Sequence, residues 1–238
     1  MDFSTLILGI GITLGFFVQT ILGFGASLTA LPFLLIILDL RDSIALIAVF
    51  LPFFSTILIY QNRKLINKKV VLEMAIGGVI GLTIGIFALK YGNPEILKKL
   101  LGVFIVCYVG YSTIKRQKVK IFNKLGFVFA LLGGFFSGLY SSGGSLFATY
   151  IYNKLEQPKL VRATIIGSLG IINFIRIPLL VGTGIITMNT VEKSLYMIPF
   201  FLIALFLGNK FYSKINQVMF KKFFLIVLFI LGLKLIFF

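Results

Sequence analysis

The chain contains the same interruption twice, a cluster of glycine and serine inside a long apolar stretch. The first copy, residues 14–35, reads LGFFVQTILGFGASLTALPFLL, and the second, residues 132–153, reads LGGFFSGLYSSGGSLFATYIYN. An offset of 118 relates the two copies and continues without a gap to Ala45 and Ala163. Glycine lets a helix end and the chain reverse where a side chain would clash. We therefore predict two related halves, residues 1–118 and 119–238.

The composition places these halves in a membrane. Of the 238 residues, 59% are hydrophobic and 13% are charged, whereas soluble domains carry roughly a quarter charged residues. Two apolar stretches, 4–38 and 123–153, contain the breaks, and each fits either two short crossings or a re-entrant helical hairpin. We predict an all-α polytopic integral membrane protein with one membrane domain, residues 1–238. Apolar runs of spanning length without such a Gly/Ser break, roughly 17–25 residues, occupy 43–61, 70–90, 97–115, 160–181, 193–212 and 218–237.

The basic residues predict the orientation of the spans. The net charge is +16, and sixteen of the 23 Lys and Arg residues lie in the connections 61–69, 115–124, 153–162 and 210–222. Cytoplasmic loops of membrane proteins carry an excess of Lys and Arg. We therefore predict that these four connections face the cytoplasm. The same argument explains the positive charge without nucleic acid as a partner.

This orientation predicts that the two halves are inverted. With the basic connections inside, segment 123–153 begins and ends in the cytoplasm, whereas segment 4–38 begins and ends outside. Each half then contains one Gly/Ser-broken helical hairpin and three transmembrane helices, which is an odd net number of crossings. We predict two inverted repeats, an architecture found in many secondary transporters.

The paired breaks are the first candidate for a binding site. A helix start presents free backbone N–H groups and the positive end of the helix dipole, which attract anions. Serine is a favoured N-cap residue, and Ser27 and Ser145 each follow a break. Matched interruptions in two halves point to the binding site of a transporter. The alternative is that the small residues only permit close helix packing.

Arg176 is the second candidate, because it lies inside the predicted span 160–181. A central arginine costs about 2.5–3.5 kcal/mol on insertion scales, so it usually faces a cavity or a partner. Its planar guanidinium suits an oxyanion. The alternative is that Arg176 snorkels to the nearby membrane surface. The predicted substrate-binding residues are Gln19, Gly25, Ser27, Gly143, Gly144, Ser145, Asn173 and Arg176.

The sequence lacks the residues that metal binding, enzymatic catalysis and ATP hydrolysis need. The chain has no histidine, and its one cysteine, Cys107, lies in an apolar run where we predict a small buried side chain. All seven carboxylates fall in connections or at the ends of spans, so we expect no metal site, no cofactor and no catalytic residue. No Gly-Lys-Ser/Thr phosphate loop is present. We therefore expect a protein that is not an enzyme and does not hydrolyse ATP.

The repeated segments resemble the TauE/SafE sulfite exporter-like family of the toluene-sulfonate uptake permease superfamily. Ala26 and Ser27 replace glycines of the longer family run, and Tyr150 replaces its second proline. The resemblance implies transport of small sulfur-containing or organic anions across the bacterial cytoplasmic membrane. The residues that carry it are Gly23, Phe24, Gly25, Ala26, Ser27 and Pro32 in the first half, Ser142, Gly143, Gly144 and Ser145 in the second, and Ala45, Ala163 and Thr164 downstream.

The direction of transport follows from the membrane potential. Expelling an anion from a cell that is negative inside is downhill by about 2.3 kcal/mol per charge per 100 mV. We therefore predict an exporter of a small anion such as sulfite or an organosulfonate. Coupled import of a small carboxylate or sulfonate, and a non-transporting membrane scaffold, stay open as alternatives. The expected partners are the small anion and the lipid bilayer, and the oligomeric state stays open, including a homo-oligomer.

Overall fold

The computed structural model describes residues 3–113 and 125–237, and this part of the chain contains helices and no strand. The predicted all-α fold is thereby confirmed. A short 3-10 helix, Arg63–Leu65, follows α3. The helices are α1 (Phe3–Leu22), α2 (Ala26–Leu34), α3 (Leu40–Asn62), α4 (Lys68–Tyr91), α5 (Pro94–Thr113), α6 (Gly126–Tyr140), α7 (Gly144–Lys154), α8 (Pro158–Gly182), α9 (Met188–Tyr212) and α10 (Gln217–Phe237).

Six of the described helices are both long and apolar enough to cross a membrane, namely α1, α3, α4, α5, α8 and α9. This confirms a polytopic membrane protein. α10 has 21 residues and covers the span predicted at 218–237, but it is not among the six. It carries Lys221 and Lys222 near its start and Lys234 near its end, which shorten its apolar stretch.

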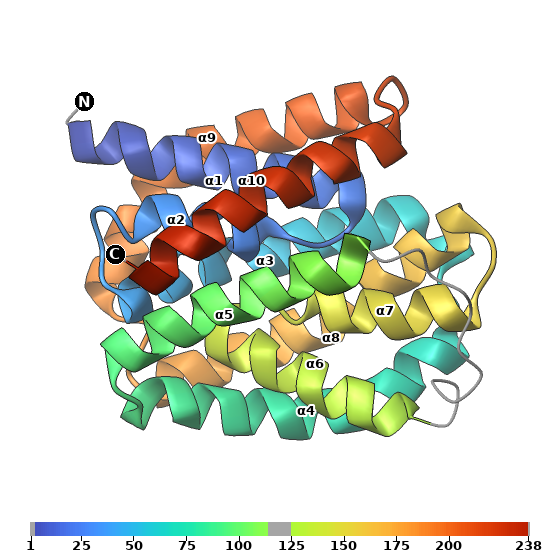
Figure 1. Cartoon of the computed structure of the whole chain (residues 1–238), viewed down its shortest axis with the longest axis horizontal. Helices are drawn as coiled ribbons and strands as arrows, with labels where there is room; N and C mark the ends of the chain where they lie inside the picture. Colours follow the sequence, from blue (N-terminus) through green and yellow to red (C-terminus); the bar gives the residue numbers. More distant parts are fainter. Residues whose placement is uncertain (1–2, 114–124, 238) are drawn as a thin grey trace.

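Both broken segments form helical hairpins. α2 has nine residues and α7 has eleven, so they are about 14 and 17 Å long at roughly 1.5 Å per residue. Neither helix reaches across the roughly 30 Å of bilayer hydrocarbon. In Figure 1, the chain leaves α2 at the end of the molecule where α1 begins, and α7 returns to the end where α6 begins. The structure therefore favours hairpins over paired crossings.

The order of the helices repeats along the chain. The offset of 118 relates α1–α5 to α6–α10 in order, and the packing follows the same rule. α4 packs on α6 as α1 packs on α9, while α3 packs on α8 and α5 on α10. In Figure 1, α5 and α10 lie side by side and run in opposite directions. These features support the predicted repeat, and its inversion across the membrane stays a prediction.

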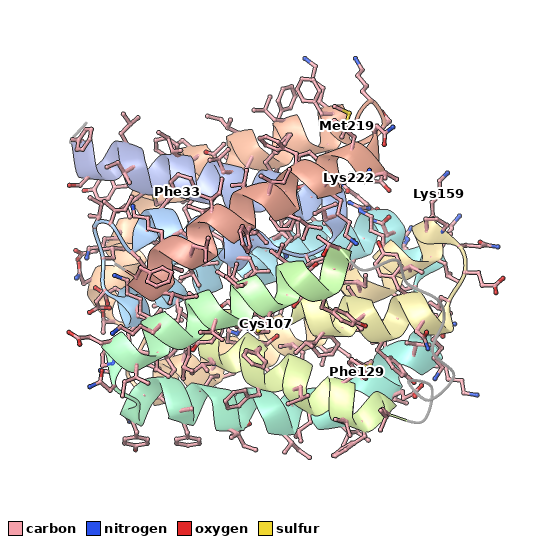
Figure 2. The ribbon with its side chains drawn as sticks, in the orientation of Figure 1. Phe33, Cys107, Phe129, Lys159, Met219 and Lys222 are labelled. Atoms are coloured by element: carbon pink, nitrogen blue, oxygen red, sulfur yellow. The ribbon has the colours of Figure 1, made fainter. Side chains whose placement is uncertain are left out.

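The basic connections gather at one end of the bundle. In Figure 1, the α3–α4, α7–α8 and α9–α10 connections all lie at the right-hand end, and Figure 2 shows Lys159 extending there. The basic residues at 115–124 lie outside the described residues. The predicted orientation requires these connections to lie at the same end of the bundle, as they do. The side of the membrane that this end faces stays a prediction.

The prediction for Cys107 is wrong. This residue lies on α5 and its side chain is exposed on the outside of the bundle (Figure 2). The outer surface of a membrane protein meets lipid rather than water, so apolar residues cover it as well as the core. An apolar run therefore does not distinguish a buried position from a lipid-facing one.

Candidate functional site

At the first break, between α1 and α2, the chain reverses at Gly25, and the side chain of Gln19 caps the new helix. Gly25 precedes the first residue of α2 with φ 103°, a left-handed conformation that favours glycine. The Gln19 side-chain oxygen accepts a hydrogen bond of 3.2 Å from the backbone N–H of Ala26. Ser27 is the second residue of α2, and its buried hydroxyl has no hydrogen-bond partner. The prediction that Ser27 caps this helix is wrong, because Gln19 reaches across the break and takes that role.

The second break is built differently. α7 begins at Gly144, and a Cβ on the preceding Gly143 would lie 1.7 Å from the carbonyl oxygen of Gly133. Gly143 is therefore required by the close approach of α7 to α6. Ser145 donates a 3.4 Å hydrogen bond to the carbonyl oxygen of Ser142. Ser145 thus lies inside the first turn rather than at the N-cap position, and this prediction is also wrong.

Arg176 is buried in the centre of the second half. Only 1% of its surface is exposed, so it does not snorkel to the membrane surface. Its Nη2 donates a 2.5 Å hydrogen bond to the carbonyl oxygen of Ser137, which lies in the last turn of α6. Its Nε and Nη1 atoms are buried and have no hydrogen-bond partner among the described residues 3–113 and 125–237. Each unsatisfied buried donor costs about 1–3 kcal/mol, and more when the group is charged.

A small central cavity lies between the two breaks. Its volume is about 10 Å³, roughly the room of one water molecule. Ser27, Gly143 and Ser145 do not line it and lie buried beside it. The other five predicted site residues do line it. The full lining is Gln19, Phe24, Gly25, Leu51, Ser137, Ser141, Ser142, Gly144, Leu169, Asn173 and Arg176.

Six lining residues were not predicted, and the offset of 118 relates five of them to another residue of the lining. The missed residues are Phe24, Leu51, Ser137, Ser141, Ser142 and Leu169. The offset pairs Gln19 with Ser137, Phe24 with Ser142 and Leu51 with Leu169. The central cavity therefore lies where equivalent parts of the two halves meet.

Ser55 and Asn173 form a further pair related by the offset, whereas Arg176 has no charged counterpart in the first half. The offset pairs Ser55 with Asn173, whose Nδ2 donates a 2.9 Å hydrogen bond to the Ser55 hydroxyl. The counterpart of Arg176 is Leu58, so the second half alone supplies the charge.

The electrostatics of the central cavity favour a negative ligand. Its lining contains one arginine and no acidic residue. The N-terminal ends of α2 and α7 border it through Gly25 and Gly144, and such ends carry partial positive charge. Among the residues that the structure describes, no group of three His, Cys, Asp or Glu side chains could hold a metal ion.

Comparison with known proteins agrees with this architecture. The family model described as Sulfite exporter TauE/SafE matches residues 7–235, nearly the whole chain. Comparisons with the curated proteins and with the solved structures give no significant match. The family match covers both hairpins and all six helices of spanning character. The chain belongs to the sulfite exporter TauE/SafE family.

Proposed function

We propose that this protein exports a small oxyanion, such as sulfite or an organosulfonate, through the central cavity. Family membership implies a membrane transporter of sulfite or related anions, which sets the class. The observation that supports an oxyanion most directly is Arg176, whose Nε and Nη1 atoms are buried without partners beside the cavity. The proposed location of this transporter is the bacterial cytoplasmic membrane.

The site would hold the anion from three directions. The unpaired Nε and Nη1 donors of Arg176 would supply charge-assisted hydrogen bonds to oxygens of a sulfite or sulfonate group. The backbone N–H groups at the starts of α2 and α7 supply further donors. One of them, the N–H of Ala26, is bonded to Gln19 in this structure. Binding would release Gln19 from Ala26 and offer that donor to the anion.

Entry of the anion requires movement of the hairpins. The cavity has room for about one water, and its walls include Phe24, Leu51 and Leu169. An oxyanion of several heavy atoms fits only when the hairpins separate. The protein would then act as a carrier that opens to one side at a time, as other carriers built from repeats do.

The proposed direction rests on energy and on the lining. Export of an anion is driven by the membrane potential, about 2.3 kcal/mol per charge per 100 mV. No carboxylate and no histidine lines the central cavity to couple transport to protons. Import of the same anion would need a coupling ion. Coupled import and a non-transporting scaffold are the alternatives that the following experiment separates.

The test is anion flux in liposomes that contain the purified protein. A potassium-diffusion potential is imposed without a proton or sodium gradient, and sulfite, an organosulfonate and a small carboxylate are compared. We expect saturable sulfite or sulfonate flux that follows the potential. Flux that ignores the potential but requires sodium or protons would establish coupled import. Absence of saturable flux for every anion would support the scaffold.

The same assay tests the role of Arg176. We expect Arg176→Gln to weaken anion affinity roughly 10- to 100-fold, because hydrogen bonds to charged groups contribute about 1.5–3 kcal/mol. The matched control is Lys193→Gln, which removes the same charge from an exposed pair with Asp42 at 3.8 Å. Equal affinities of Arg176→Gln and the wild-type protein would move the anion site elsewhere.

A further inference from the structure

A second and larger cavity lies at the basic end of the bundle. Its volume is about 830 Å³, and it is bordered by α1, α5, α7, α8 and α10. It shares no lining residue with the central cavity. The lining is Ile21, Leu22, Val109, Ser112, Thr113, Tyr152, Pro158, Arg162, Val218, Lys221, Lys222, Leu225, Ile226 and Phe229. We call it the lateral cavity.

The lateral cavity has an apolar wall and a basic rim. Val109 of α5 and Leu225, Ile226 and Phe229 of α10 form much of the wall. The rim carries Arg162, Lys221 and Lys222, and among the residues that the structure describes no acidic residue lines the cavity. Such a surface is amphipathic and complements a molecule with a negative head and an apolar chain.

The apolar wall continues onto the outside of the bundle. Ile226 is 60% exposed and Phe229 is 42% exposed, and both belong to the lining. In a membrane these exposed side chains meet lipid chains rather than water. Lys222 is also exposed, and Figure 2 labels it on α10 toward the end from which Lys159 extends. We therefore expect the lateral cavity to open toward the bilayer near the basic end of the bundle.

Arg162 provides a fixed positive charge at the inner side of the rim. Its Nη2 donates to the carbonyl oxygen of Thr20, and its guanidinium lies 4.2 Å from the centre of the Tyr212 ring. The side chain is 9% exposed, and its Nε atom is buried without a hydrogen-bond partner. Contacts with three other helices, including a 3.5 Å hydrogen bond from Nη1 to the side-chain oxygen of Asn62, hold this arginine in place. Its charge lines a cavity to which the described part of the chain contributes no carboxylate.

We propose that the lateral cavity binds an anionic phospholipid. Lys221, Lys222 and Arg162 would surround the phosphate, and an acyl chain would lie along Leu225, Ile226 and Phe229. Basic pockets between transmembrane helices on the cytoplasmic side are known to bind such head groups. This proposal does not depend on the transported substrate.

Two other occupants fit the lateral cavity less well. A small free anion makes no use of the long apolar wall. The chain segment that continues from Thr113, residues 114–124, carries five basic residues and no acidic residue. Its charge has the same sign as the rim and does not complement it. An anionic lipid satisfies both the rim and the wall.

The test measures lipid binding to the delipidated protein in detergent. Phosphatidylglycerol and phosphatidylcholine with identical acyl chains, and inorganic phosphate, are added separately and followed by native mass spectrometry and thermal unfolding. The variant is Lys221→Gln with Lys222→Gln. The matched control is Lys210→Gln with Lys214→Gln, which removes two exposed charges from the same end but outside the lateral cavity.

We expect phosphatidylglycerol to bind and to raise the melting temperature, whereas phosphatidylcholine and phosphate do neither. The variant should bind phosphatidylglycerol roughly 10- to 30-fold more weakly, since each surface lysine contributes about 5-fold, and the control should bind as the wild-type protein does. Equal binding of the two lipids, or unchanged binding by the variant, would overturn the proposal. Binding of phosphate as strong as that of phosphatidylglycerol would also overturn it, in favour of a site for free anions.

Discussion

Two helix pairs that the offset relates, α4 with α6 and α1 with α9, are packed in different ways. Between α4 and α6 the backbones touch. A Cβ on Gly81 would lie 1.9 Å from the carbonyl oxygen of Leu131, and one on Gly134 would lie 2.0 Å from that of Gly78. Between α1 and α9, a Cβ on Gly9 would meet the Phe200 ring at 2.4 Å, which is a side chain. The first interface is made by backbone, whereas at Gly9 the second is made by the end of a side chain.

Polar contacts strengthen the same contrast. The second hairpin is joined to α4 at its α7 arm, where Tyr150 and Lys154 both bond the carboxylate of Glu73. This is the position where tyrosine replaces the proline of the family pattern. The first hairpin reaches α9 through a weaker contact, a 3.3 Å hydrogen bond from Thr13 to the Phe200 carbonyl oxygen. We infer that the second hairpin is the fixed wall of the central cavity and the first hairpin is the wall that moves.

The experiment with the largest expected effect tests whether the two halves have opposite orientations in the membrane. Single cysteines are introduced at Lys64 and at Met188, both exposed, in a Cys107→Ala background. An impermeant maleimide added to intact cells should label the cysteine at 188 fully and the cysteine at 64 only after the membrane is opened. Labelling of both from the same side would contradict the inverted arrangement and remove the basis for comparing the hairpins.

The second test compares the two interfaces directly. Gly81→Ala should lower the free energy of unfolding by about 3 kcal/mol, at the upper end of overpacking effects, because the backbone of α6 cannot move aside. Gly9→Ala should cost less than about 1 kcal/mol, since the end of the Phe200 ring can shift and alanine favours the helix. Thermal unfolding in detergent measures both. Equal losses would show that the two interfaces are equally rigid.

The third test compares equivalent residues of the two breaks, Gln19 and Ser137. Gln19→Ala should lower stability by about 1 kcal/mol, as other lost helix caps do, and should tighten anion binding because the N–H of Ala26 is left bare. Ser137→Ala keeps the carbonyl oxygen that Arg176 binds, so we expect a change within about 0.5 kcal/mol. Unfolding and anion affinity are measured together. Weaker anion binding by Gln19→Ala would indicate that Gln19 contacts the anion instead of releasing Ala26.

The smallest expected effect concerns the hydrogen bond between the halves. Ser55→Ala and Asn173→Ala each leave a buried polar group unpaired, so each should cost about 1 kcal/mol. A double-mutant cycle should give a coupling energy of about 0.5–1 kcal/mol. Additive losses would mean that this contact does not hold the two halves together.

The sequence predicted those features that depend on short stretches of the chain. The span predicted at 70–90 is the helix Lys68–Tyr91, and both Gly/Ser breaks separate helices as expected. Apolar length and the conformational freedom of glycine act locally, so they are visible in the sequence. Several residues that lie 118 positions apart in the sequence also line the central cavity together, because equivalent parts of the two halves meet there.

The features that were missed depend on which groups approach in three dimensions. Gln19 caps α2 only because the chain reverses at Gly25, and Gly143 is needed only because α7 lies against Gly133. The two alternatives for Arg176 differ in the direction of the side chain relative to the other helices. Helix periodicity cannot supply that direction when every face of a helix is apolar.

The size of the central cavity has a consequence for the rate of transport and for the cell. A central cavity with room for about one water is too small to hold a continuous file of water, so we expect no leak of protons or ions through it. Under the proposed export, the membrane potential would be preserved between transport cycles. Each anion must instead pass during a helix movement, and such movements take microseconds to milliseconds or longer. We expect turnover to be limited by the motion of the first hairpin, with flux far below that of a pore and steeply dependent on temperature.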